Sequence, residues 1–201
     1  MPFFPPTRKR HLFERAALMI RQFAGVKPDE PLDPYRLAKH VKLLVVDLDR
    51  IQGLSEESRK QLTMIDPRSW SGGTTKPLPN GWRLVVLNPM HGRERNAATL
   101  MEEICHVILG HSLGRVNVES ENGVGFRDYN AKDEEAAYAV GAAALLPYYA
   151  LHQAVHNGMS AEQIAARFGV SKDLVEYRIK VTRLWETYQK RLLNGAQNNW
   201  Q

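Results

Sequence analysis

The chain has 201 residues, of which 43% are hydrophobic and 24% are charged, and its formal net charge is +5 at pH 7. This length allows one main domain of roughly 150 residues with a small appendage. The composition is that of an ordinary globular protein, which excludes a chain that is disordered throughout. The positive charge permits contact with nucleic acid, but most basic residues are scattered, so charge alone favours a solvated surface.

The chain contains a single cysteine, Cys105, which excludes an internal disulfide framework and is typical of a reducing compartment. Residues 1–6 lack the apolar core of a signal peptide. The longest apolar run, around Val140 to Leu146, is far too short to span a membrane. We therefore expect a soluble cytoplasmic protein without a membrane anchor.

The first predicted elements are two helices and a strand. Apolar residues from Leu12 to Phe23 recur with helical spacing, which predicts an amphipathic helix that ends at Gly25. A short helix is expected from Asp33 to His40, and the run from Val41 to Val46 predicts a strand because β-branched residues favour extended backbone. The chain therefore begins with helix before it forms sheet.

The middle of the chain predicts more sheet and then two helices. Glycine and proline residues between positions 53 and 81 indicate turns that separate short strands. The strand from Trp82 to Leu87 ends at Asn88-Pro89, because proline cannot donate to a β-ladder. Helix-forming residues then run from Arg93 to His111, and an alanine-rich helix is expected from Asp133 to Leu146. These two helices would face each other across a loop.

The first of these two helices carries the motif Glu102-Glu103-Ile104-Cys105-His106. In the zincin motif H-E-x-x-H, two histidines one turn apart bind zinc and the glutamate between them is the general base. Here Glu102 and His106 stand at i and i+4, so both can reach one cation, and Glu103 occupies the position of the base. A carboxylate ligand makes the site harder and less selective for zinc. Zinc is the expected ion, and manganese or a metal-free site are the alternatives.

A third ligand must come from another element, and the acidic residues at the head of the next helix are the candidates. Glu135 is the first choice and Glu134 the reserve. Several carboxylates around one histidine repel one another, which requires either a cation or a raised pKa. His111 is a further reserve ligand, although its five-residue offset from His106 turns it to another helix face. The alternative interpretation is that the glutamates only solvate two helix surfaces, the commonest role of this residue type.

The surroundings of the motif make it more specific. The ordered features are a strand ending in Asn88-Pro89, then Arg95, Thr99-Leu100-Met101, E-E-x-x-H, Leu109-Gly110-His111, Glu135-Ala136 and Leu145-Leu146-Pro147. This series resembles the ImmA/IrrE family of metallo-endopeptidases, with its pattern R-x-x-x-T-L-x-H-E-x-x-H and a later glutamate-alanine helix that ends in L-L-x-P. The resemblance extends from about Leu12 to Tyr188.

The resemblance implies a role for each residue of the motif. His106 matches the second histidine ligand, Glu103 the catalytic glutamate and Glu135 the downstream glutamate ligand, while Glu102 stands where the family has its first histidine. The implied fold is α+β, with a zincin-like domain of a short sheet and flanking helices. The implied activity is metal-dependent cleavage of an intracellular protein such as a repressor-like regulator, in regulation or a stress response. The replaced ligand leaves catalysis itself open.

The C-terminal part has the pattern of a helix-turn-helix. Ser160 and Gln163 form a capping-box pattern, Gly169 supplies a turn and Ser171 caps a second helix. The candidates for DNA contact on or near that helix are Lys172, Tyr177, Arg178 and Lys180. An αα-hairpin used for packing or dimerisation fits this pattern equally well, since the shape alone does not prove groove insertion.

Two hypotheses therefore remain. The first is a metal-dependent endopeptidase, and the second is a catalytically inactive scaffold that binds DNA or a partner protein through its C-terminal helices. The expected organisation is a flexible tail at 1–10, the peptidase-like domain at 11–150, the helical module at 151–193 and a flexible tail at 194–201. The sequence is compatible with a homo-oligomer.

Overall fold

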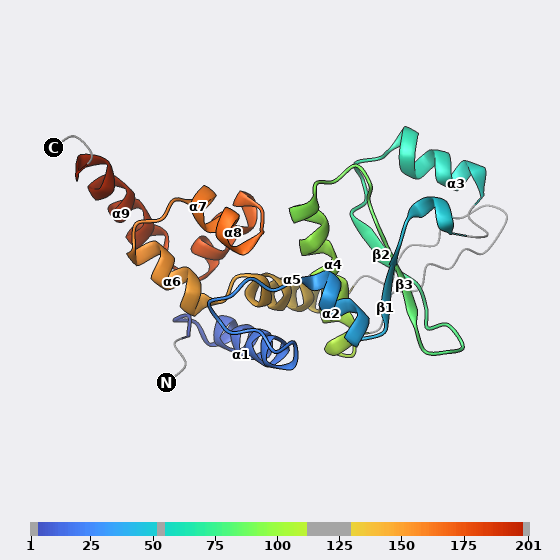
Figure 1. The fold of residues 1–201 in the computed structure, drawn as a ribbon, viewed down its shortest axis with the longest axis horizontal. Coiled ribbons are helices and arrows are strands. Elements are labelled where there is room, and N and C mark those ends of the chain that lie inside the picture. Colours follow the sequence, from blue (N-terminus) through green and yellow to red (C-terminus); the bar gives the residue numbers. More distant parts are fainter. Residues whose placement is uncertain (1–3, 52–54, 112–129, 199–201) are drawn as a thin grey trace.

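The computed structural model describes residues 4–51, 55–111 and 130–198. In this part of the chain the sheet lies at one end of an elongated molecule, and the C-terminal helices lie at the other (Figure 1). Helices α4 and α5 occupy the middle and connect the two ends. The mixture of helices with one small sheet confirms the α+β class. Among the described helices, none combines the length and apolarity needed to cross a membrane.

The sheet has the strand order β1-β3-β2. Its strands are β1 (Leu43–Val46), β2 (Gly72–Thr74) and β3 (Arg83–Leu87). Strand β1 runs parallel to β3, and β2 runs antiparallel to it, so β2 forms an edge of the sheet among the strands that the structure describes. At Gly72 a Cβ atom would lie 2.7 Å from the Thr99 side chain, so glycine lets the edge strand approach helix α4 closely.

The segment between β1 and β2 contains more helix than the sequence predicted. It begins with the short helical turn η1 (Leu48–Arg50), and continues with α3 (Glu56–Lys60) and η2 (Gln61–Ile65) before β2. Ser55 caps α3 by accepting a hydrogen bond from the Ser58 amide, and two glutamates occupy the first turn, where they favour helix. Among the described residues, helical turns therefore stand where short strands were expected, and β2 follows them.

Helices α4 (Arg93–Ile108) and α5 (Ala131–Leu145) pack against each other. Small residues allow this close approach, because a Cβ at Gly141 would already lie 3.5 Å from the backbone of Met101 and of Glu102. Helix α1 (Arg8–Phe23) covers α5, and α2 (Pro34–His40) lies against α4. The buried guanidinium of Arg21 donates to the carbonyl of Ala144, which joins α1 to the end of α5.

Four helices follow Pro147, which cannot continue the preceding helix. They are α6 (Tyr148–His156), α7 (Ala161–Phe168), α8 (Lys172–Val181) and α9 (Trp185–Asn198). The predicted capping box of α7 is present, and Gly169 ends this helix with a left-handed φ of 66°. The predicted two-helix pattern is thus present as an α7–α8 pair, while its use in DNA binding remains a prediction.

A buried ion pair attaches this pair of helices to the rest of the molecule. The guanidinium of Arg178 lies 2.7 Å from the carboxylate of Glu14 on α1, and both side chains are almost fully buried. Arg178 also donates to the Leu146 carbonyl at 3.0 Å, and the Tyr148 amide donates to Glu14. The polar groups at the bend between α5 and α6 therefore have partners from both ends of the chain.

Helices reach into the expected tails and across the expected boundary, and the division into domains stays a prediction. Helix α1 already begins at Arg8, and α9 continues to Asn198, so helix extends into both segments predicted as flexible. Helix α6 crosses the expected boundary at residue 150. The ion pair described above brings α1 and α8 into direct contact.

Candidate metal centre

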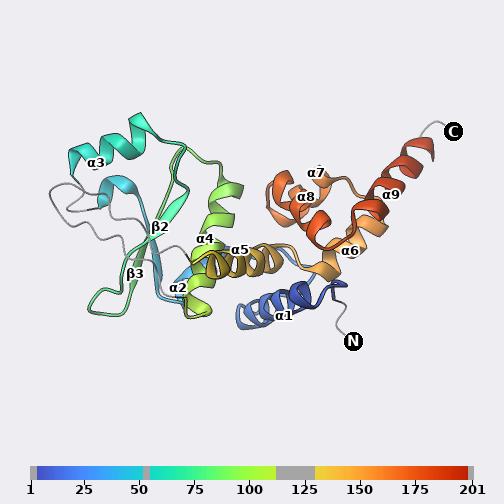
Figure 2. The same cartoon turned by 180° about the vertical axis from the view of Figure 1, so that it is seen from behind.

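Helix α4 presents the three chemically important residues of the motif near its C-terminal end. Glu103 is 5% exposed and His106 is 6% exposed, whereas Glu102 is partly exposed. Glu102 and His106 are one turn apart and lie on the side of α4 that faces the start of α5. Figure 2 shows α5 beginning beside α4 and running from there toward the C-terminal helices.

The start of α5 brings a third ligand atom to this place. One ligand atom each from Glu102, His106 and Glu134 lies within 4.8 Å of the other two, and the distance from His106 Nε2 to Glu134 Oε2 is 3.6 Å. Ligand atoms around a tetrahedral zinc ion, at about 2.1 Å from the metal, are about 3.4 Å apart. Small movements of the side chains would therefore bring this group to the spacing of a metal site.

Glu135, the first choice from the sequence, lies elsewhere. Neighbouring residues on a helix differ by about 100° in direction, and Glu135 faces α1, where its carboxylate lies 2.6 Å from Lys9 Nζ. The hydrogen bond from Lys9 lowers the pKa of Glu135, and the positive charges of Lys9 and Arg10 add to this effect. The structure thus brings the reserve residue Glu134 to the motif, and it places Glu135 outside the group.

His111, the other reserve, lies beside His106 but is not one of the three grouped residues. Its Nδ1 is 3.3 Å from Nδ1 of His106, and the two rings meet edge to face with centroids 5.1 Å apart. Its Nε2 is 3.8 Å from Oδ1 of Asp133. The expectation that the five-residue offset would turn His111 away is wrong, because α4 ends at Ile108 and the chain bends back at Gly110, whose φ is 70°.

Thr74 is a residue that the sequence analysis did not identify. From the edge strand β2, its hydroxyl donates a hydrogen bond of 2.6 Å to Glu103 Oε2. Nothing in the local sequence indicates this contact, because it depends on how the strand packs across α4. Cys105 is fully buried, and burial raises the pKa of its thiol, with a smaller effect from the charge of Glu102. Burial and a raised pKa disfavour the reactive thiolate form, and Cys105 is not one of the three grouped residues.

A pocket of about 350 Å³ opens beside Glu102. It lies between α4, α5 and the beginning of α8, so the C-terminal helices form one of its walls. Burial raises the pKa of Tyr138, which lines the pocket from α5, and Tyr177 and the negative charges of Glu102 and Asp173 raise it further. The lining residues are Ser71, Arg95, Ala98, Thr99, Glu102, Tyr138, Ser171, Asp173 and Leu174.

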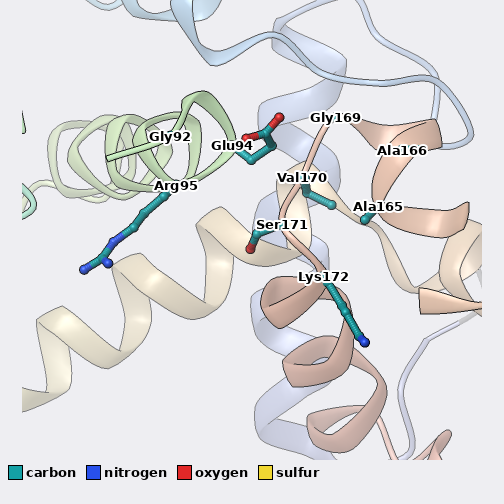
Figure 3. Close-up of a pocket in the computed structure, with 9 residues that line it drawn as sticks. All are labelled: Gly92, Glu94, Arg95, Ala165, Ala166, Gly169, Val170, Ser171 and Lys172. Carbon is teal, nitrogen blue, oxygen red and sulfur yellow. The ribbon is translucent and has the colours of Figure 1, made fainter. Parts of the chain in front are cut away.

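A second pocket, of about 450 Å³, lies between the beginning of α4 and the turn from α7 to α8 (Figure 3). Two basic side chains, Arg95 and Lys172, line it, but their charged ends point away from each other. The ammonium group of Lys172 lies 2.6 Å from Glu162. These two side chains therefore do not converge on one anion in this pocket.

The four candidates for DNA contact are not displayed on one surface. Arg178 is buried in its ion pair with Glu14, which corrects the prediction that it faces a ligand on the outside. The Tyr177 hydroxyl accepts a hydrogen bond from Arg10, and Lys180 lies over the ring of Trp185 at 5.2 Å. Lys172 remains exposed but is paired with Glu162.

Comparison with known proteins gives a family match and similar solved structures. The model of the peptidase family described as IrrE N-terminal-like domain (Peptidase_M78) matches residues 60–180. The structure of a Mycobacterium tuberculosis transcriptional regulator is similar to this one with a TM-score of 0.51 and 15% sequence identity, over 84% of this chain and 46% of that chain. The chain thus spans less than half the length of that regulator, and the likeness concerns the fold. No curated protein gives a significant match.

Proposed function

Because the chain belongs to the IrrE N-terminal-like domain family, we propose that it is a metal-dependent endopeptidase with Glu102, His106 and Glu134 as metal ligands. Family membership by itself indicates a metallopeptidase-like or regulatory role. The observation that carries the proposal is the convergence of three donor atoms from two helices within 4.8 Å, on the helix that also carries the buried Glu103.

The donor set fits a divalent cation. Two carboxylates and one imidazole supply oxygen and nitrogen ligands, and a cation would offset the repulsion between the two glutamates. When bound, such an ion would act as a Lewis acid on the scissile carbonyl and make a water molecule more acidic. Glu102 in place of a histidine makes the set harder, so we expect manganese to compete with zinc more effectively than at a two-histidine site.

Glu103 would transfer the proton. Its carboxylate would accept a proton from the attacking water and deliver it to the leaving amine, as general base and then general acid. The Thr74 hydroxyl holds Oε2 of this carboxylate at 2.6 Å and thereby fixes its orientation relative to the ligands. The low exposure of Glu103 excludes most bulk water, which strengthens its interaction with the reacting groups.

The substrate would be a protein segment in extended form. Among the described strands β2 lies at an edge and contains Thr74, so a peptide lying along it would pass next to Glu103. The pocket beside Glu102 would then receive one side chain of the substrate, in contact with Tyr138 and Leu174. A repressor-like regulator, as the family resemblance implies, remains our proposed target.

The proposal is tested by cleavage of a proteome-derived peptide library, with the products identified by mass spectrometry. The wild-type protein, supplied with zinc or manganese, should produce new peptide termini that share a sequence preference. The variant Glu103→Gln keeps the size of the side chain and a hydrogen-bond acceptor for Thr74 but cannot accept the proton, so it should produce none. Equal cleavage by both proteins would assign the activity to a contaminant or another site.

The second hypothesis, a regulator that binds DNA through the C-terminal helices, is favoured by one feature, the capped α7–α8 pair. The burial of Arg178 removes one of its basic contacts. The appropriate test is salt-dependent DNA binding by the wild type and by Lys172→Ala with Lys180→Ala, because these two side chains are exposed. Affinity that does not change in this double variant would contradict groove binding by α8.

A further inference from the structure

The residues around His106 suggest how its ring is oriented, which the family match does not address. We propose that Asp133 and His111 are positioning residues that hold the imidazole proton of His106 on Nδ1, so that Nε2 is available to a cation. This inference deepens the proposed function, since it concerns the same metal site. It gives His111 a role different from that of a metal ligand.

The end of helix α4 creates the contact. The amide of His111 donates to the His106 carbonyl at 3.0 Å, and the amide of Gly110 donates to the Val107 carbonyl at 3.2 Å. Together with the left-handed φ of Gly110, these two bonds form a Schellman motif. The motif folds the chain back over the last turn of the helix, and it places the ring of His111 against that of His106.

The distances distinguish the roles of the two ring nitrogens of His106. Nε2 of His106 faces the ligand group, 3.6 Å from Glu134, whereas Nδ1 faces His111 at 3.3 Å. Of the two nitrogens in this contact, one must donate and the other must accept. A cation can bind only a nitrogen without a proton, so Nε2 is a ligand when His106 carries its proton on Nδ1 and donates it to Nδ1 of His111.

Asp133 selects this arrangement. The carboxylate lies 3.8 Å from Nε2 of His111, and its negative charge favours a proton on that nitrogen. A neutral His111 with its proton on Nε2 has Nδ1 as an acceptor, which is the partner that His106 requires. Asp133 therefore favours the tautomer of His111 that can accept a hydrogen bond from Nδ1 of His106.

The two imidazole rings are largely buried, which limits competition from water for their hydrogen bonds. The side chain of His111 is 12% exposed and that of His106 is 7% exposed, so bulk water has limited access to the nitrogens. In metalloproteins the ring nitrogen opposite the metal commonly donates to a carboxylate or a carbonyl, and loss of that partner reduces metal affinity by about 10–100-fold. Here a histidine stands between the ligand and the carboxylate. His111 is not one of the three grouped residues, and its nitrogens face His106 and Asp133, as a positioning role requires.

The first experiment measures the tautomer of His106 in the metal-free full-length protein, by long-range ¹H–¹⁵N NMR correlation at pH 8, where an ordinary imidazole is neutral. The wild type should show His106 with its proton on Nδ1. The variant His111→Phe removes the acceptor, and it should give a mixture of both tautomers. A wild-type protein with the proton on Nε2, or an unchanged tautomer in His111→Phe, would overturn the inference.

The second experiment measures zinc and manganese affinity by competition with a chelator. His111→Phe should bind about 10–100-fold more weakly, and His111→Gln, whose amide oxygen can accept from Nδ1, should recover part of this loss. Asp133→Asn should fall between the wild type and His111→Phe. The matched control is His40→Gln, because His40 is exposed and its ring is hydrogen-bonded to the Arg36 carbonyl of its own helix.

The two experiments separate the inference from the proposed function. A wild-type protein that binds neither metal contradicts the proposed function, and the tautomer measurement then still decides the role of His111. Metal binding that is equally strong in His111→Phe and the wild type contradicts the inference alone. The unfolding midpoint of each metal-free variant shows whether a change in affinity reflects lost stability, and His111→Gln provides the same comparison where His111→Phe does not fold.

Discussion

The buried ion pair between Glu14 and Arg178 should determine how firmly the C-terminal helices are attached. The side chains are 1% and 3% exposed, and the groups lie 2.7 Å apart. In the variant Glu14→Gln the amide oxygen can still accept from the Tyr148 amide, but the guanidinium loses its counter-charge in a desolvated place. Removal of one partner of such a pair costs about 3–5 kcal/mol.

This magnitude is accessible to thermal unfolding followed by circular dichroism. For a chain of this size each kcal/mol shifts the midpoint by about 2–4 °C, so Glu14→Gln should lower it by about 6–20 °C. Arg178→Met should have a similar effect, and the double variant should lose less than the sum because neither charge is then left alone. Glu135→Gln, which removes an exposed pair with Lys9, is the control and should change little.

If both single variants lowered the free energy of unfolding by less than about 1 kcal/mol, the effect would be typical of an exposed ion pair. That result would refute the reasoning, since it would mean that water reaches the contact between α1 and α8. It would also mean that the C-terminal helices are loosely attached and do not form a fixed wall of the pocket beside Glu102.

Three further predictions concern Gly72, Gly110 and Cys105. Gly72→Ala should destabilise the protein by about 1–3 kcal/mol in chemical denaturation, because its Cβ would lie 2.7 Å from the Thr99 side chain. The control Gly73→Ala should not destabilise it, because no atom lies within 4 Å of a Cβ at that position. Gly110→Ala should cost about 1 kcal/mol because of the left-handed φ, and it should weaken metal binding by displacing His111; unchanged affinity would contradict this. Cys105 should resist alkylation by iodoacetamide at pH 8 until the protein unfolds, and rapid labelling of the native protein would show that its thiol is not buried.

The local features of the site could be predicted from the sequence. The spacing of Glu102, Glu103 and His106 depends only on the helical period, and the helix itself follows from residues without glycine or proline. The capping box at Ser160 and the turn at Gly169 are local in the same sense, and both are present. The small α+β architecture also follows from local patterns of apolar residues.

The remaining features depend on contacts between distant parts of the chain. The choice between Glu134 and Glu135 depends on the rotation of α5, which is set by Gly141 against α4 and by α1 on the other side. The position of His111 depends on where α4 ends. Arg178 shares the buried face of α8 with Leu174 and Val175, but its partner Glu14 lies at the opposite end of the chain and could not be identified from the local sequence.

The central claim is that Glu102, His106 and Glu134 form one metal site, and elemental mass spectrometry tests it most directly. The protein should be purified without a metal-affinity tag and compared with Glu134→Gln and Glu135→Gln, which are the same substitution at neighbouring positions. We predict near-stoichiometric zinc or manganese in the wild type and in Glu135→Gln, and loss of the metal in Glu134→Gln. A wild type that stays metal-free after addition of both ions, or a Glu134→Gln variant that keeps its metal, would contradict the claim.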